Sequence, residues 1–204
     1  MSKGRLDPIL RALVGVDTKY HGVIGDIINR FNSPDAPAWD ATFKQSLKNG
    51  VSAQSVTLLL EFETDVSIPA IIGFSAVNAF RVGETLDGIK VGWLGERFKK
   101  LFLKKTETAT PAAELRQHVL KKPARDPAII TELGGEAKVE ITLGQFWNYL
   151  TTADRTLWHV AYIRDDESVL WAVYAYWRSG GLSVEALPLD HPLDWDVGYR
   201  FLSR

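Results

Sequence analysis

The stretch Val169-Leu-Trp-Ala-Val-Tyr-Ala-Tyr-Trp177 is the clearest structural signal in the chain. Its residues are almost all β-branched, aliphatic or aromatic, which is typical of a β-strand. Neighbouring side chains of a strand point to opposite faces. One face therefore carries Val169, Trp171, Val173, Ala175 and Trp177, and the other carries Leu170, Ala172, Tyr174 and Tyr176. Both faces are apolar, so one must cover the core and the other needs a helix, a partner or a ligand over it.

The segments around this strand predict a helix followed by an antiparallel meander. Thr142 is expected to cap a helix that continues through Leu150, because its hydroxyl can accept a free backbone N–H. Hairpin-sized connections then join four runs of strand type, which favours strands that pair in sequence order. These runs are Leu157–Ile163, Val169–Trp177, Leu182–Leu187 and Trp195–Phe201.

The first half of the chain predicts two helices, then short strands, then a basic helix. The expected helices are Asp7–Phe31, Pro37–Lys48 and Leu94–Leu103, and the expected strands are Val56–Glu63, Val66–Pro69, Phe74–Val82 and Ile89–Trp93. Residues 106–127 are polar and rich in proline, so we predict a linker-like junction there. The fold class is therefore α+β, with an N-terminal region 1–105 and a helix-plus-meander region 128–204.

Composition places the chain among ordinary globular proteins. It has 204 residues, 46% of them hydrophobic, and 24 Lys and Arg balance 25 Asp and Glu. The absence of cysteine excludes disulfides, a thiolate nucleophile and cysteine-based metal sites. The longest apolar run, residues 68–80, is much shorter than the roughly 20 residues that span a bilayer, and the start lacks a signal-peptide pattern. We expect a cytoplasmic protein without membrane contact, cofactor or metal.

The C-terminal half also resembles proteins without an assigned activity. The residues concerned are Ile130-Thr-Glu-Leu-Gly-Gly-Glu-Ala-Lys-Val-Glu-Ile-Thr-Leu-Gly-Gln145, Ala161-Tyr-Ile-Arg-Asp-Asp166, Val169–Trp177 and Trp195-Asp-Val-Gly-Tyr-Arg-Phe-Leu-Ser-Arg204. They are similar to a group of uncharacterised small proteins from uncultivated candidate-phylum bacteria, mainly over residues 127–204. The resemblance implies a bacterial origin and a helix-plus-meander half, and it transfers no catalytic residue.

Aromatic residues give the first candidate for a binding surface. Five of the seven tryptophans follow Gln145, and several tyrosines accompany them. If the chain's own helices do not cover these rings, they form a surface for a protein partner or for self-association. The candidate residues are Trp158, Trp171, Tyr174, Tyr176, Trp177 and Trp195.

Positively charged residues give the second candidate for a binding surface. Residues 97–125 hold nine Lys and Arg against two Glu, which leaves a net charge of +7 in a chain whose total is -1. Such a segment attracts phosphates, although a charged run is more often a solvated face. The candidate phosphate contacts are Lys99, Lys100, Lys104, Lys105, Lys121 and Lys122.

Residues suited to catalysis are sparse. The four histidines are scattered, without the spacing of a metal-binding helix. Only His191 with Asp194, or His159 beside a carboxylate, offers material for a small hydrolase. The sequence thus favours a non-enzymatic interaction module that uses the aromatic sheet or a helix surface for contact. Single-stranded nucleic-acid binding through the basic segment and exposed aromatic residues is the first alternative, and a small hydrolase is the second.

Overall fold

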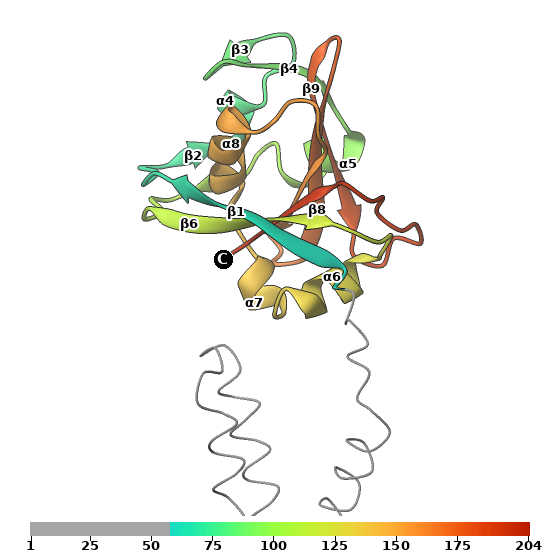
Figure 1. Cartoon of the computed structure of the whole chain (residues 1–204). Coiled ribbons are helices and arrows are strands. Elements are labelled where there is room, and N and C mark those ends of the chain that lie inside the picture. The colour runs from blue at the N-terminus through green and yellow to red at the C-terminus, as the bar shows by residue number, and fades with distance from the viewer. Residues whose placement is uncertain (1–57) are drawn as a thin grey trace, which may run out of the picture. The chain divides into compact units, whose positions relative to one another are not determined.

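The structure, a computed structural model, describes residues 58–204. The expected helices Asp7–Phe31 and Pro37–Lys48 lie outside the described residues. Within the described part the fold is α+β, with one large sheet and short helices on its two sides (Figure 1). The helices are α4 (Ala76–Ala79), α5 (Glu96–Leu101), α6 (Asp126–Glu132), α7 (Glu136–Val139) and α8 (Leu143–Thr152).

Eight strands form the large sheet, in the order β1-β6-β10-β7-β8-β9-β4-β3. The pairs β10–β7 and β4–β9 are parallel, and the other neighbours are antiparallel. Its strands are β1 (Leu60–Ile68), β3 (Thr85–Leu86), β4 (Ile89–Leu94), β6 (Ala113–Leu120), β7 (His159–Arg164), β8 (Leu170–Arg178), β9 (Gly181–Pro188) and β10 (Arg200–Ser203). Two short strands, β2 (Phe74–Ser75) and β5 (Thr106–Glu107), pair separately.

Alternation along β8 divides its side chains between two cores, as the sequence predicted. Val173 and Ala175 belong to the first core, whereas Leu170 and Ala172 belong to the second. The first core is covered by α4, α5 and α8, and the second by α6 and α7, which Figure 1 shows on opposite sides of the β1–β6 ribbon. Both faces of the sheet are therefore largely covered by the chain itself.

Helix α8 begins where the sequence predicted. The Thr142 hydroxyl accepts the backbone N–H of Gln145 at 3.1 Å, and the Gln145 side-chain oxygen accepts the N–H of Thr142 at 3.0 Å. This capping box satisfies two backbone donors that would otherwise lack partners at the helix start. Phe146 and Leu150 then point into the first core.

The predicted four-stranded meander is only partly correct. β7, β8 and β9 are antiparallel neighbours in sequence order, but β10 does not continue from β9. Residues 189–199 instead return to the far side of β7, where β10 pairs parallel with β7 and antiparallel with β6. In that position β10 satisfies backbone groups on both neighbouring strands, whereas beside β9 it would compete with β4.

Residues 106–127 are part of the sheet and not a linker-like junction. They contain β6, which pairs with β1 on one side and with β10 on the other. The prolines that suggested a junction stand outside the strand: Pro111 and Pro123 flank β6, and Pro127 lies in the first turn of α6. Proline lacks a backbone donor and fits the ends of elements, so here it marks their boundaries.

The expected division between regions 1–105 and 128–204 does not separate the described residues. β4 pairs with β9, and Phe80 and Phe98 pack in the same core as Phe146. Two local predictions were also wrong. Thr64 and Asp65 lie inside the continuous β1 beside a β-bulge, and residues 76–79, expected in a strand, form α4.

We expect His118 on β6 to make the free energy of unfolding depend on pH. Its imidazole is buried, and the Nε2 atom lies 2.9 Å from the Ser203 hydroxyl. Burial, and next the charge of Arg116, lowers the pKa of His118 to about 4. Below pH 6.5 the unfolded chain therefore binds a proton that the folded chain excludes. The free energy of unfolding should fall as the pH drops from 6.5 to 4, by about 2 kcal/mol from this group.

Urea titrations at several pH values measure this slope, and His118→Gln provides the comparison. Glutamine can still bond to Ser203 but does not titrate, so the variant should lose less stability over the same pH range. The carboxylates are the same in the unchanged protein and in His118→Gln, so their titration cancels in the comparison. Equal slopes would show that His118 is not the source of the dependence.

Candidate functional site

Five aromatic residues gather on the second-core side of the sheet, and we call them the aromatic cluster: Trp158, Tyr174, Tyr176, Trp195 and Tyr199. The Trp158 ring stacks on Tyr176 at a centroid distance of 3.9 Å and on Tyr199 at 5.1 Å, with interplanar angles of 12° and 17°. The cluster arises because Trp158 precedes β7, Tyr199 precedes β10, and β8 lies on the other side of β7. The sheet order thus places side chains from three strands next to one another.

Trp195 closes one side of the cluster at an angle to the other rings. Its plane is inclined by 71° to Tyr174 and by 52° to Tyr199. The buried carboxylate of Asp126, at the start of α6, accepts the Trp195 indole N–H at 2.7 Å and the Tyr162 hydroxyl at 2.8 Å. Burial raises the pKa of Asp126, while these two hydrogen bonds act in the opposite direction. Asp126 therefore fixes the orientation of the Trp195 ring.

Four of these rings, those of Trp158, Tyr174, Trp195 and Tyr199, line a pocket of about 210 Å³, which we call the aromatic pocket. Its apolar wall is completed by two leucines, and its rim carries one histidine and two aspartates. The lining residues are Trp158, Tyr174, Leu187, His191, Leu193, Asp194, Trp195, Asp196 and Tyr199. Trp158, Tyr174 and Tyr199 lie nearly parallel, and the inclined Trp195 ring beside them makes the surface concave.

Several polar atoms of the aromatic pocket have no partner within residues 58–204. Three groups make no hydrogen bond to the described protein: the hydroxyls of Tyr174 and Tyr199 and the indole N–H of Trp158. All three side chains are partly exposed. No fully buried side-chain polar atom of the described part lacks a partner, so these three groups reach solvent. They are available to a ligand without breaking any internal bond.

Carboxylates give the aromatic pocket a negative environment. Burial, and next the charge of Glu185, raises the pKa of Tyr174 to about 12. Burial, and next the charge of Asp196, also raises the pKa of Tyr199. On the rim, Asp194 pairs with Arg125 at 3.3 Å, whereas the Asp196 carboxylate pairs with no cation of residues 58–204.

Two of the predicted aromatic residues lie outside the aromatic cluster. Trp171 and Trp177 point to the first-core side of β8 and pack against that core. Trp171 donates its indole N–H to Asp165 at 2.9 Å, and Trp177 meets the ring of His159 edge-on at 5.8 Å. Trp158, Tyr174, Tyr176 and Trp195 are the predicted residues that the structure brings together, although Tyr176 and Trp195 are buried.

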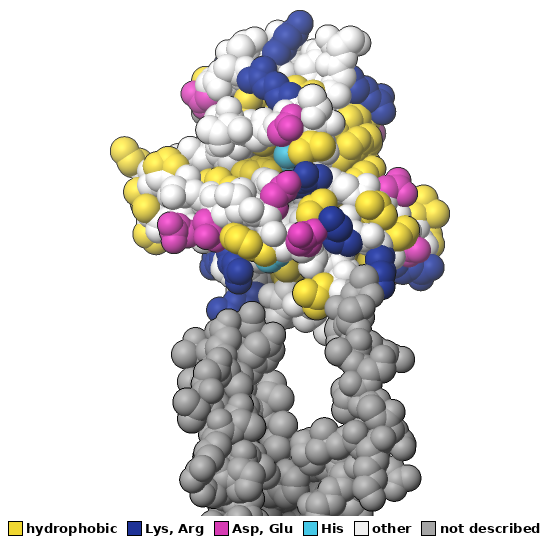
Figure 2. Space-filling view, in the orientation of Figure 1, with side chains coloured by type: hydrophobic (Ala, Val, Ile, Leu, Met, Phe, Trp, Pro, Cys, Tyr) yellow, Lys and Arg dark blue, Asp and Glu magenta, His cyan; other side chains and the backbone are white. Residues whose placement is uncertain are grey.

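The six predicted lysines do not form one surface with the aromatic pocket. None of them lines it, and they divide between α5 with the loop that follows it and the end of β6. The ion pairs within residues 58–204 include those that join Lys99 to Glu96, Lys105 to Asp166 and Lys121 to Glu61. On the face that Figure 2 shows, Lys and Arg side chains are scattered among Asp and Glu.

The two histidines proposed for a hydrolase occupy different environments. His159 is buried: its Nδ1 lies 2.6 Å from the Tyr149 hydroxyl, its Nε2 lies 2.8 Å from the Asp154 carbonyl oxygen, and burial lowers its pKa. His191 lines the aromatic pocket beside Asp194, but its Nδ1 accepts the backbone N–H of Leu193 at 3.3 Å. The lining holds no serine, threonine or lysine that this histidine could activate as a nucleophile.

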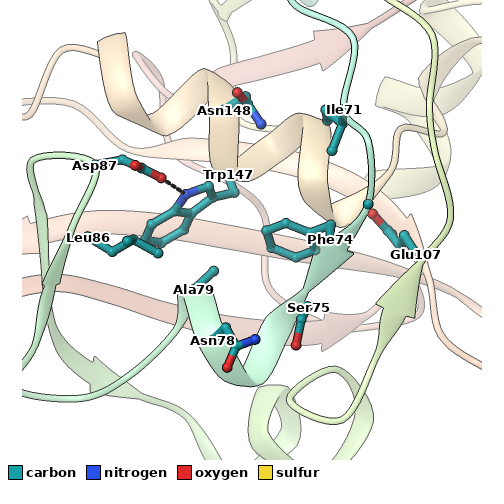
Figure 3. A pocket seen from close by; sticks show the side chains of 11 residues that line it. Ile71, Phe74, Ser75, Asn78, Ala79, Leu86, Asp87, Glu107, Trp147 and Asn148 are labelled. Atoms are coloured by element: carbon teal, nitrogen blue, oxygen red, sulfur yellow. Dashed lines mark hydrogen bonds between the residues drawn. The ribbon is translucent and has the colours of Figure 1, made fainter.

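A larger pocket of about 550 Å³ lies beside α8 and α4 (Figure 3). Trp147 and Phe74 supply its apolar surface, with carboxylates on two sides. Asp87 accepts the Trp147 indole N–H at 3.0 Å, and Glu107 accepts two backbone N–H groups at the start of α8, both at 2.8 Å. Asn148 donates to the backbone within α8. These polar groups hold α8 in place.

Sequence reasoning missed three contributors to the aromatic pocket: Asp126, Asp196 and Tyr199. Tyr199 falls in the predicted last strand, but its proximity to Trp158 follows from the position of β10 beside β7. The Asp126-Pro127 pair signals a helix start. Nothing in the sequence indicates that this carboxylate meets Trp195, which is 69 residues away.

No helix within residues 58–204 is both long and apolar enough to cross a membrane. In the same part of the chain, no three His, Asp or Glu side chains come together in a group that could hold a metal ion. The resemblance of residues 127–204 to uncharacterised bacterial proteins stays a prediction. Comparison of the chain with models of protein families, with curated proteins and with solved structures finds no match in any of the three.

Proposed function

We propose that this protein is a non-enzymatic binding module that holds a side chain of a protein partner in the aromatic pocket. The observation that carries the proposal is the combination of angled rings around about 210 Å³ with unpaired, solvent-accessible polar atoms on Trp158, Tyr174 and Tyr199. Rings with a polar tip are common at protein interfaces, since they give apolar contact and hydrogen bonds together. A pocket of this size suits one side chain.

The same features weigh against single-stranded nucleic acid as the ligand. Bases stack on exposed ring faces while basic groups contact the phosphates. Here Trp158 stacks between Tyr176 and other rings of the cluster, and the pocket rim carries Asp194 and Asp196. Those carboxylates would repel a phosphate backbone, and none of the six candidate lysines lines the pocket.

The unpaired indole N–H of Trp158 provides a direct test. We expect at least one of three probes, the N-acetyl amides of lysine, norleucine and glutamate, to shift the Trp158 indole signal in an NMR titration. The shift should saturate in the millimolar range, which corresponds to about 4 kcal/mol of binding free energy and suits a single side chain. Trp158→Phe identifies the signal.

Two alanine variants give the matched comparison. Trp158→Ala, with binding followed from the Trp195 indole signal instead, should weaken binding of the active probe at least about tenfold, because it removes the central ring of the pocket. Trp93→Ala removes an indole that is 47% exposed on β4, outside the aromatic pocket, and should leave the affinity unchanged. A Trp158 signal that none of the three probes moves would contradict the proposal.

A further inference from the structure

Charge around the aromatic pocket indicates which kind of side chain it accepts. Two aspartates line the pocket, Asp194 and Asp196, and the charge of Glu185 acts on the Tyr174 hydroxyl. Arg125 pairs with Asp194, and Arg178 lies over the Tyr176 ring. The lining of the pocket thus contains two carboxylates and no lysine or arginine.

Asp196 is the carboxylate with the greatest capacity to bind a new partner. It lines the aromatic pocket and acts electrostatically on the Tyr199 hydroxyl, yet it has no cation partner within residues 58–204. Asp196 is exposed and stands beside partly buried rings, so a cation whose stem packs on those rings can reach its carboxylate.

The aromatic cluster already holds one cation of the protein itself. The Arg178 guanidinium lies 4.8 Å from the centroid of the Tyr176 ring, within the range of cation–π attraction. Tyr176 stacks in turn on Trp158. The far side of the cluster, at Tyr199 and Trp195, has rings and carboxylates but no such cation over them in the described part.

From these observations we infer that the aromatic pocket recognises a lysine or arginine side chain of the protein partner. The inference rests on the proposed function and specifies its ligand. The aliphatic stem packs against Leu187 and the rings, the charged end approaches Asp196, and the tyrosine hydroxyls accept its remaining N–H groups. Positive charge on the ligand offsets the repulsion among the rim carboxylates, which a neutral or acidic side chain cannot do.

The test compares the N-acetyl amides of lysine and norleucine, which have the same carbon skeleton and differ by the ammonium group. Binding is measured from the Trp158 indole signal of the full chain at low salt. The lysine amide should bind about fivefold or more tightly than the norleucine amide. The glutamate amide should bind more weakly than either. Raising the salt concentration should reduce the preference for lysine, because screening weakens charge interactions.

Asp196→Asn isolates the contribution of the carboxylate. It keeps the size of the side chain and should reduce the preference for lysine over norleucine, without changing the affinity for norleucine. Glu167→Gln, in the exposed β7–β8 turn outside the pocket, should leave the preference unchanged.

The outcomes separate the inference from the proposed function. Equal binding of lysine and norleucine amides would overturn the cation preference while the pocket remains a side-chain site. If neither they nor the glutamate amide moved the Trp158 signal, the proposed function would fail as well. A lysine preference that Asp196→Asn does not reduce would contradict the role assigned to Asp196.

Discussion

Asp126→Ala should lower the free energy of unfolding by about 3 kcal/mol, although it removes only one small side chain. The carboxylate accepts hydrogen bonds from Tyr162 and Trp195, and both donors are buried. Without it, each donor loses its partner in a region that excludes water, and an unsatisfied buried donor costs about 1–3 kcal/mol. Urea denaturation followed by tryptophan fluorescence measures the loss.

Asp126→Asn is the matched control for this prediction. The amide oxygen of asparagine can still accept from both donors, and the neutral group is easier to bury than a carboxylate, whose pKa burial raises. We expect this variant to lose less than half as much stability as Asp126→Ala. It should also retain binding in the aromatic pocket, since Trp195 keeps its orientation. An equal loss in both variants would show that the charge of Asp126, and not its hydrogen bonds, stabilises the fold.

Gly181→Ala should destabilise the protein by about 3 kcal/mol or more, because the new methyl group meets backbone atoms that cannot move alone. Gly181 begins β9 with a φ of +120°, a conformation that residues with a side chain rarely adopt. A Cβ atom there would lie 2.3 Å from the carbonyl oxygen of Lys90. Relief of this clash would separate β9 from β4, and with it part of the first core.

The neighbouring glycine provides the control. A Cβ atom on Gly180 would have no atom within 4 Å, and its φ does not lie in the positive range. Gly180→Ala should therefore change the free energy of unfolding by less than about 0.5 kcal/mol. Thermal and urea unfolding of both variants test the pair. A stable Gly181→Ala protein would show that the β8–β9 turn can rearrange without loss of the β4–β9 contact.

The site was only partly predictable, for a reason that Trp158 and the lysines illustrate. The aromatic content of the last strands indicated a binding surface, and Trp158 with Tyr174 is part of it. Charge summed along residues 97–125 suggested one basic surface, but the structure divides those lysines between two regions and pairs several of them with carboxylates. The net charge of a sequence segment says little about the charge of a surface, because carboxylates distant in the sequence, such as Asp166, come to lie beside its lysines.

Local sequence determined which side chains share a face and where elements begin. The two-residue period of β8 separated Trp171 from Tyr174, and the Thr142–Gln145 spacing fixed the start of α8, because both depend on backbone geometry within a few residues. Only the tertiary structure decided that β10 lies between β6 and β7, which brings Tyr199 to Trp158 and Trp195 over Asp126. Strand order depends on backbone pairing and burial between segments far apart in the chain, and such long-range preferences leave no periodic pattern in the sequence.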